Sequence, residues 1–321
     1  LRASTHDVEA DKMDDRDARD LIVRAVAALY LNGESAQARV DAATSRVTAS
    51  NALLKLATDK HDAGTATGVD VLRAKVQLAN DQQMLLQAAT LYKQALLELA
   101  RNLGMSPGIP LELADKLAYQ PLEARDAESL IATAVTERAD YQSLASQRQS
   151  LLDRQRANHA RSYPSLSLNG NFGGLGRSVG GIEATGLIQG QIDFTLYDRD
   201  REGEAVEIRS QIRSVDDRIA DLRRGIEQDV REALLNLDSA TQQVDVARQG
   251  QELAGRELEM AQDRFAQGTA NNVEVVTAQD ELARAQENYI IAVSSHMDAK
   301  FALARALGNT EQNVSDFALN K

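Results

Sequence analysis

Four histidines and one glycine-rich run are the residues whose types could serve acid–base catalysis, metal binding or phosphate binding. His6, His61, His159 and His296 are scattered, and no H-E-x-x-H or G-x-S-x-G motif is present. The run GNFGGLG (170–176) lacks the Lys-Ser/Thr that completes a phosphate loop, and we interpret it as a hairpin loop. Because the chain also has no cysteine, thiolate chemistry is excluded. We therefore expect no enzyme, cofactor or bound metal.

Composition narrows the class of protein. The 321 residues include 4 Pro and no Trp, the aromatic content is 4%, and the net charge is -12. Such a profile is typical of long helices. The acidic balance argues against nucleic acid as a partner, because its binders gather Lys and Arg on one face. No run of about 18 apolar residues predicts a transmembrane helix.

A long internal repeat organises the chain. At an offset of 204 positions, residues 57–104 align without a gap with residues 261–308, and 18 of the 48 pairs are identical. The aligned region includes AGTATGVDVL (63–72) against QGTANNVEVV (267–276), and it ends with LARNLG against LARALG. Shared helical composition explains scattered matches but not a gapless register through a turn. The chain therefore contains two copies of one helix-turn-helix unit.

Each copy is predicted to form two long helices. In the second copy apolar or small residues follow a 3,4 spacing that is broken only by Gln251, which is the heptad signature of helices packed side by side. A helix over about 201–267 would be roughly 100 Å long. Gly64 and Gly268 stand where a helix ends with a left-handed residue. Taken alone, this pattern also fits a plain antiparallel coiled coil.

Two strands are expected between the copies. Residues 162–172 and 185–197 alternate strictly between apolar and polar side chains. A soluble hairpin packed on the helices is one interpretation. The other is a pair of outer-membrane strands, which have this length and one lipid-facing side, and which need several chains to close a barrel.

The order of these motifs resembles the TolC family of outer-membrane efflux factors over nearly the whole chain. The residues that carry the resemblance are the duplicated turns, the LARxLG ends, ERADYQSLASQ (137–147), SYPSLSL (162–168) and LYDRDREGE (196–204). The resemblance implies a mainly α fold with a β-hairpin, in which long antiparallel coiled-coil helices form a periplasmic α-barrel and two transmembrane strands join a trimeric β-barrel. It also implies a homotrimer in the outer membrane of a Gram-negative bacterium, with most of the chain in the periplasm. Its partners would be a periplasmic adaptor (membrane fusion) protein, an inner-membrane transporter and outer-membrane lipid.

Six segments follow from this interpretation. They are the first repeat (1–104), an irregular equatorial linker (105–125), a helix leading to the barrel (126–161), the hairpin (162–198), the second repeat (199–308) and a C-terminal tail (309–321). Subtracting 204 from the hairpin positions places a second hairpin before Leu1, so we expect the parent protein to contain one.

Three groups of residues become candidate sites. The resemblance implies that the turns contact the adaptor; the alternative is that their residues only cap the helices. It also implies that acidic residues favour cations at the periplasmic entrance of the tunnel. The alternative for these acidic residues is that they stabilise the N-terminal ends of their helices. On the strands, alternate residues are expected to face lipid and their neighbours Gln189, Gln191 and Asp193 the lumen. The adaptor contacts are Gly64, Thr65, Ala66, Phe265, Gly268, Thr269 and Ala270; the entrance residues are Asp70 and Glu274; the lipid-facing residues are Leu166, Leu168, Phe172, Ile188, Ile192 and Phe194.

The expected function is the exit duct of a tripartite efflux pump, which passes small molecules or ions to the exterior. The alternative is a soluble coiled-coil scaffold without a channel, and dependence of the full-length protein on detergent separates the two.

Overall fold

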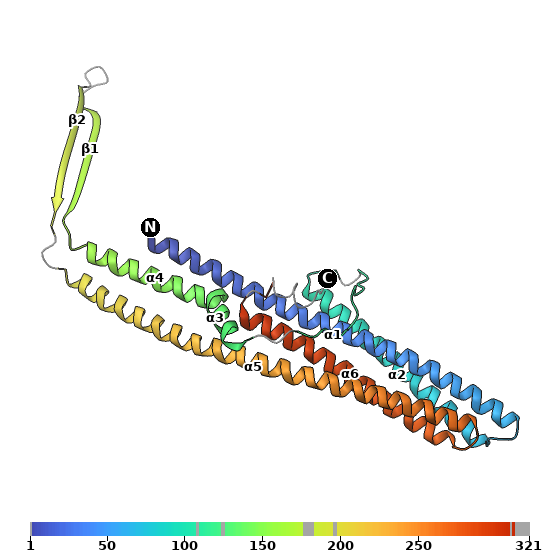
Figure 1. The fold of residues 1–321 in the computed structure, drawn as a ribbon. Helices are drawn as coiled ribbons and strands as arrows, with labels where there is room; N and C mark the ends of the chain where they lie inside the picture. The colour runs from blue at the N-terminus through green and yellow to red at the C-terminus, as the bar shows by residue number, and fades with distance from the viewer. Residues whose placement is uncertain are drawn as a thin grey trace. The chain divides into compact units, whose positions relative to one another are not determined.

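A computed structural model describes residues 2–106, 109–122, 126–175, 183–194, 198–308 and 310–311. Along these residues helices and strands follow in the order α1, α2, α3, α4, β1, β2, α5, α6 (Figure 1). Long helices with one β-hairpin confirm the expected fold class. The hairpin loop, the strand end at 195–197 and most of the expected C-terminal tail lie outside the described residues.

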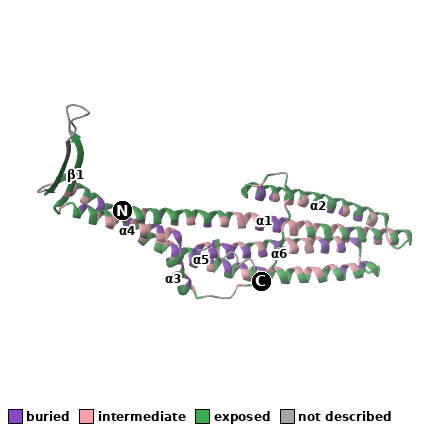
Figure 2. Cartoon of the chain, turned by 90° about the horizontal axis from the view of Figure 1, so that it is seen from above, coloured by how far each residue is buried: buried purple, intermediate pink, exposed green. Residues whose placement is uncertain are grey.

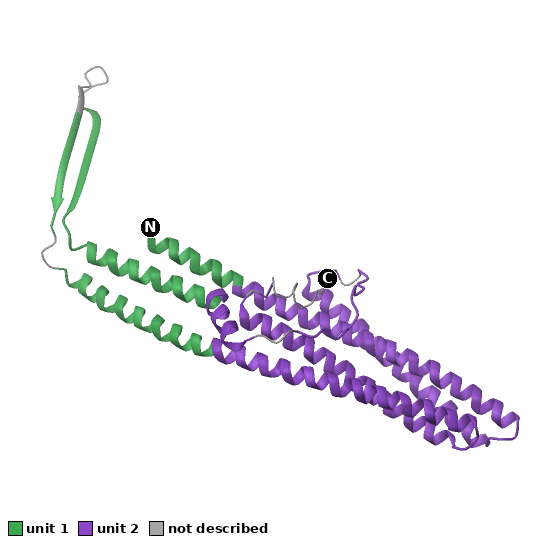
Figure 3. Cartoon of the chain, in the orientation of Figure 1, with its two compact units in different colours: residues 1–16, 139–225 green, residues 17–138, 226–321 purple. Residues whose placement is uncertain are grey.

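The chain divides into two compact units (Figure 3). One unit consists of residues 1–16 and 139–225, and it holds the hairpin, α4 and the adjoining ends of α1 and α5. The other consists of residues 17–138 and 226–321, and it holds α2, α3, α6 and the remainder of α1 and α5. We call them the hairpin unit and the repeat unit.

The two repeats form matching helix pairs. The first pair is α1 (Arg2–Asp62) and α2 (Gly68–Asn102), and the second is α5 (Arg199–Ala266) and α6 (Asn272–Leu307). The first residue of α6 is thus equivalent to the first residue of α2, since 272 and 68 differ by 204. The duplication seen in the sequence is a duplication of this helix pair.

Small side chains fill the core near the turns of the repeat unit. One buried cluster combines residues of all four long helices: Leu53, Ala57, Ala74, Ala261, Phe265, Val275 and Ala278. Because four of its seven members are alanines, the helix backbones can approach closely there. The heptad spacing read from the sequence is consistent with this packing.

An irregular linker at 109–122 crosses the repeat unit. A Cβ added to Gly33 of α1 would lie 3.1 Å from Cδ1 of Leu113, so the missing side chain lets the linker approach the helix. The ring of Tyr119 in the linker packs edge-on against the ring of His296 on α6, with 4.8 Å between the ring centroids. Lys300 Nζ, also on α6, donates to the carbonyl of Gln120 at 3.2 Å. The linker is therefore fixed to helices from both repeats.

The expected single helix over 126–161 is wrong. The structure has two helices, α3 (Ala127–Glu137) and α4 (Ala139–Ala160), separated by Arg138 in an extended conformation. The end of α6 packs closely against this break, since a Cβ on Gly308 would lie 2.5 Å from the Arg138 Cα. Arg138 Nη1 also donates to Asp229 Oδ2 at 2.8 Å. These contacts join residues that are distant in sequence, so helical periodicity could not reveal them.

The hairpin consists of β1 (Ser165–Leu175) and β2 (Glu183–Asp193), paired antiparallel. Leu166 lies opposite Ile192, and Phe172 lies opposite Gly186. The described part of the hairpin is almost entirely exposed (Figure 2).

Candidate functional site

The first turn closes α1 through backbone hydrogen bonds around Gly64, whose φ is 73°. The Gly64 N–H donates to the carbonyl of His61 at 2.9 Å, and the Thr65 N–H donates to that of Lys60 at 2.8 Å. This pair of bonds is the Schellman arrangement, which satisfies carbonyls at a helix end. The Thr65 hydroxyl also donates to Lys60 O, at 3.0 Å.

The second turn repeats the same bonds at equivalent atoms. Gly268 has a φ of 76°, and its N–H donates to Phe265 O at 3.1 Å. The Thr269 N–H donates to Arg264 O at 2.9 Å, and its hydroxyl donates to the same oxygen at 3.1 Å. The Ala270 N–H donates to it as well, at 3.3 Å. Capping therefore accounts for the glycines and for both threonine hydroxyls, while the exposed outer surface of the turns is free for a partner in this single chain.

The two turns are joined to each other. Asn272 Nδ2 at the start of α6 donates to the backbone carbonyl of Asp70 near the start of α2, at 2.9 Å. Asn272 is fully buried, so this bond lies inside the repeat unit. The turns therefore form one surface at one end of that unit.

Asp70 caps its own helix. Its Oδ2 accepts from the backbone N–H and the hydroxyl of Thr67 at 3.0 and 2.6 Å, completing a capping box. The Thr67 hydrogen bonds, followed by the more distant charge of Arg73, hold the pKa of the Asp70 carboxyl below its usual range against the opposing effect of burial. The carboxylate is therefore ionised, and it is largely occupied within its own turn.

Glu274 is arranged differently from its repeat partner. Asn271 supplies the cap of α6, accepting from the Val273 and Glu274 N–H groups. The Glu274 carboxylate instead forms an ion pair with Arg264 at 3.1 Å, and its side chain is 42% exposed against 15% for Asp70. Of the two acidic residues, Glu274 is thus the more accessible one. Their role at a tunnel entrance stays a prediction.

Phe265 differs from the other expected adaptor contacts, because its ring is buried with 4% exposed. It packs in the alanine-rich cluster, and Lys60 Nζ lies 5.4 Å from the ring centroid. A buried ring offers no contact surface, so the contact proposed for the turns is limited to the other six residues. Its equivalent, His61, is exposed, with Nδ1 at 3.2 Å from Ala66 O.

The hairpin register places the six expected lipid-facing side chains on one side. In a strand alternate residues share a face, and the pairs Leu166–Ile192 and Gly170–Ile188 tie the apolar faces of both strands together. Gln189, Gln191 and Asp193 lie on the opposite face. Leu187 is an apolar side chain on this otherwise polar face. The apolar side chains are between 61% and 87% exposed, namely Leu166, Leu168, Phe172, Ile188, Ile192 and Phe194.

Sequence reasoning missed a ladder of ion pairs between α1 and α6. The pairs are antiparallel, and their spacing along α1 is 7, 15 and 7 residues. Opposite charges whose positions add to 322 in the first two pairs and to 326 in the last two are the signal that the sequence offered. They are Asp17–Arg305 at 2.5 Å, Arg24–Asp298 at 2.7 Å, Arg39–Glu287 at 2.7 Å, and Arg46–Asp280.

The described residues contain neither a membrane-spanning helix nor a cluster of metal ligands. In that part of the chain no helix is both long and apolar enough to cross a membrane. Nor does it contain a group of three or more His, Cys, Asp or Glu side chains able to hold a metal ion.

Comparison with known proteins gives a match over most of the chain. A model of the family described as "Outer membrane efflux protein" matches residues 1–105 and 130–309. Two proteins of Pseudomonas putida, the probable efflux pump outer membrane protein SepC and the toluene efflux pump outer membrane protein TtgF, are each 24% identical over 98% of the chain. The chain spans 66% of the length of these curated relatives.

Solved structures show the same fold. The MtrE outer membrane channel of Neisseria gonorrhoeae matches 96% of this chain and 71% of its own, with a TM-score of 0.77 and 16% identity. The outer-membrane channel OprN matches 96% of this chain and 70% of its own, with a TM-score of 0.75 and 19% identity. At these identities the likeness concerns the fold.

Proposed function

The chain belongs to the outer membrane efflux protein family, and from that premise we propose that it forms part of the exit duct of a tripartite efflux pump. The duct passes small molecules or ions from the periplasm or an inner-membrane transporter to the exterior. The proposal is supported by family membership and by a hairpin whose exposed side chains are apolar on one face and, apart from Leu187, polar on the other.

The hairpin supports insertion into lipid. Transmembrane strands of outer-membrane barrels alternate between a lipid-facing and a lumen-facing side chain, and about 9 to 11 residues cross the bilayer. Both strands have 11 residues, and their apolar face is not covered by the rest of the described chain. In water such an isolated two-stranded hairpin is only marginally stable. Insertion as part of a closed barrel removes both the apolar exposure and the unpaired edges.

Exposed apolar stripes on the long helices support assembly into a homotrimer. On α5, Val246, Leu253 and Met260 recur every seven residues and are 71%, 64% and 61% exposed. On α2, Leu72 and Leu86 are 62% and 70% exposed. Heptad stripes of this kind pack against neighbouring helices. Copies of the same chain, arranged around a tunnel, would cover them.

The joined turns are the proposed contact for a periplasmic adaptor protein. Their exposed residues include Thr65 and Thr269, with Ala66 and Ala270 half-buried beside them. In a trimer three copies of Asp70 and Glu274 would supply six carboxylates beside this surface, which would favour cations at the tunnel entrance. Because the chain has no cysteine, single cysteines at Ala66 or Ala270 provide unique cross-linking positions. Cross-links to the adaptor from both positions, and none from an exposed control at Glu259, are the expected result.

The proposal is tested with the full-length protein in a Gram-negative host. We expect it in the outer-membrane fraction, soluble only with detergent, and able to conduct ions after reconstitution into planar bilayers. A protein that stays in solution without detergent and gives no conductance would instead be a soluble coiled-coil scaffold.

A further inference from the structure

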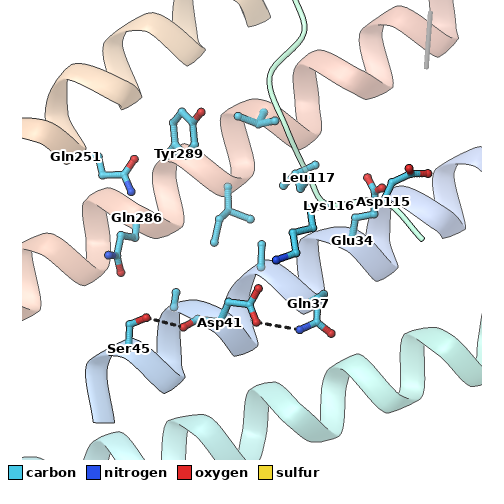
Figure 4. A pocket seen from close by; sticks show the side chains of 14 residues that line it. Glu34, Gln37, Asp41, Ser45, Asp115, Lys116, Leu117, Gln251, Gln286 and Tyr289 are labelled. Carbon is cyan, nitrogen blue, oxygen red and sulfur yellow. Dashed lines mark hydrogen bonds between the residues drawn. The ribbon is translucent and has the colours of Figure 1, made fainter. Parts of the chain in front are cut away.

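A cavity of about 310 Å³ lies beneath the linker of the repeat unit. Its walls come from α1, α5, α6 and the linker, so both repeats contribute to it. Figure 4 shows Glu34 and Asp115 on one side of the cavity, and Gln251, Gln286 and Tyr289 on the other. The volume is at the lower end of the range of ligand sites, which combine apolar walls with a few polar groups.

Glu34 is the unusual group in this cavity. It is 7% exposed, and within the part of the chain that the structure describes no side chain or backbone group forms a hydrogen bond or ion pair with its carboxylate. A largely buried carboxylate that faces a cavity without a protein partner costs stability, and a cation bound in the cavity would offset that cost. Burial, and secondly the negative charge of Asp115, raise the pKa of Glu34 to about 7. Asp115 itself accepts from the Tyr30 hydroxyl at 2.9 Å.

The cavity also explains the one break in the heptad pattern. Gln251 takes a position of α5 where the spacing calls for an apolar or small residue, and its side chain lines the cavity. Gln286 of α6 lines it as well. An amide at a seam position lowers the stability of helix packing, unless the seam opens there onto a polar site.

We propose that this cavity binds a small organic cation with a short apolar part. The ammonium or guanidinium group would lie between Glu34 and Asp115, which satisfies the buried carboxylate. The apolar part would lie against Tyr289, Leu117 and Val293. This site is independent of the duct proposed above.

The other charged groups that face the cavity leave it negative. α1 adds Asp41, whose Oδ1 accepts from Gln37 Nε2 at 3.0 Å, and the linker adds Lys116. α5 and α6 present only amides, apolar side chains and the Tyr289 phenol. Three carboxylates against one ammonium disfavour an anion and favour a cation.

Benzylamine is a suitable probe, with benzyl alcohol as its uncharged analogue of similar shape. Binding of both to the full-length protein in detergent is measured by isothermal titration calorimetry at pH 8. We expect benzylamine to bind at least tenfold more tightly than benzyl alcohol. At pH 6 its affinity falls about tenfold, because a carboxyl with a pKa of about 7 is then mostly protonated while benzylamine stays charged.

Two variants and one control complete the test. Glu34→Gln keeps the shape of the side chain, and it should weaken benzylamine binding at least tenfold and abolish the difference between pH 6 and pH 8. Ala42→Phe fills the cavity and should weaken binding equally while leaving Glu34 in place. Glu259→Gln makes the same chemical change on the exposed surface of α5, and it should change nothing.

Several outcomes would overturn the site. One is equal affinity of the unaltered protein for benzylamine and benzyl alcohol. Another is no benzylamine binding at ~10 mM, because this concentration nearly saturates even a site with a millimolar Kd. The comparison of the two probes needs no variant, so it decides the question even if Glu34→Gln or Ala42→Phe fails to fold. Unchanged binding by a folded Glu34→Gln protein would equally contradict the proposal. None of these results bears on whether the protein conducts ions.

Discussion

Gly104 and Gly308 occupy equivalent positions at the ends of α2 and α6, with φ values of 70° and 68°. Alanine and most other residues are strained at such a positive φ, by about 1–2 kcal/mol. The surroundings of the two glycines differ, because a Cβ at 104 meets nothing within 4 Å, whereas one at 308 would lie 2.5 Å from the Arg138 Cα. A side chain at either position would therefore strain the backbone, but only a side chain at position 308 would also clash with a neighbour.

Gly104→Ala should therefore cost about 1–2 kcal/mol of folding free energy, and Gly308→Ala at least about 1–3 kcal/mol more, the usual cost of overpacking. Denaturant unfolding of the two variants measures the difference directly. Equal losses would mean that α6 does not pack against Arg138 as the structure shows.

Glu34 should make stability depend on pH. Its pKa is raised from the ordinary value of 4.5 to about 7, so the folded state holds the proton more tightly than the unfolded chain. The penalty for the buried charge is absent below about pH 4.5, grows as the pH rises, and is complete above about pH 7.

Glu34→Gln removes this charge, so it should stabilise the protein at pH 8 by about 1–3 kcal/mol and have almost no effect near pH 4.5. Thermal unfolding at the two pH values checks this, with Glu259→Gln as the control. A variant that is less stable at pH 8 would show that Glu34 has a partner in the folded protein.

Among the elements, the hairpin gives the sharpest contrast between neighbouring positions. Ile188 and Gln189 are adjacent in β2 and lie on opposite faces. In the full-length protein Ile188→Lys should cost about 2–4 kcal/mol near the middle of the bilayer, whereas Gln189→Lys should cost little if its side chain faces the lumen, as we propose. Recovery of assembled protein from outer membranes compares the two. Similar recovery of both variants would contradict the facing assignment.

The sequence predicted these elements to different degrees. Periodicity located the long helices and both strands, because each depends on contacts that repeat along the chain. It could not predict the break at Arg138, where the distant Gly308 packs, or the burial of Phe265 in a cluster that draws on four helices. Gln251 was visible as an irregularity, but its meaning required the cavity that Glu34 lines.

For the whole molecule, assembly should depend on the exposed stripe of α5. Leu253→Asp places a charge in the middle of the apolar stripe, between Val246 and Met260. Because burying that charge between subunits is unfavourable, the full-length protein should shift from trimers towards monomers. Arg248→Gln changes the net charge by the same amount outside that stripe, and it should leave the trimer intact. Native mass spectrometry in detergent gives both distributions. Trimers of undiminished abundance with Leu253→Asp would place the subunit interface elsewhere.

The central claim is that copies of this chain together enclose a membrane duct. The most direct measurement is electron cryomicroscopy of the full-length protein in lipid nanodiscs. We predict three-fold symmetric particles, with the hairpins inside the bilayer, Ile188 towards lipid and Gln189 towards the lumen. Particles without three-fold symmetry, or with the hairpin packed on the helices outside the bilayer, would contradict it.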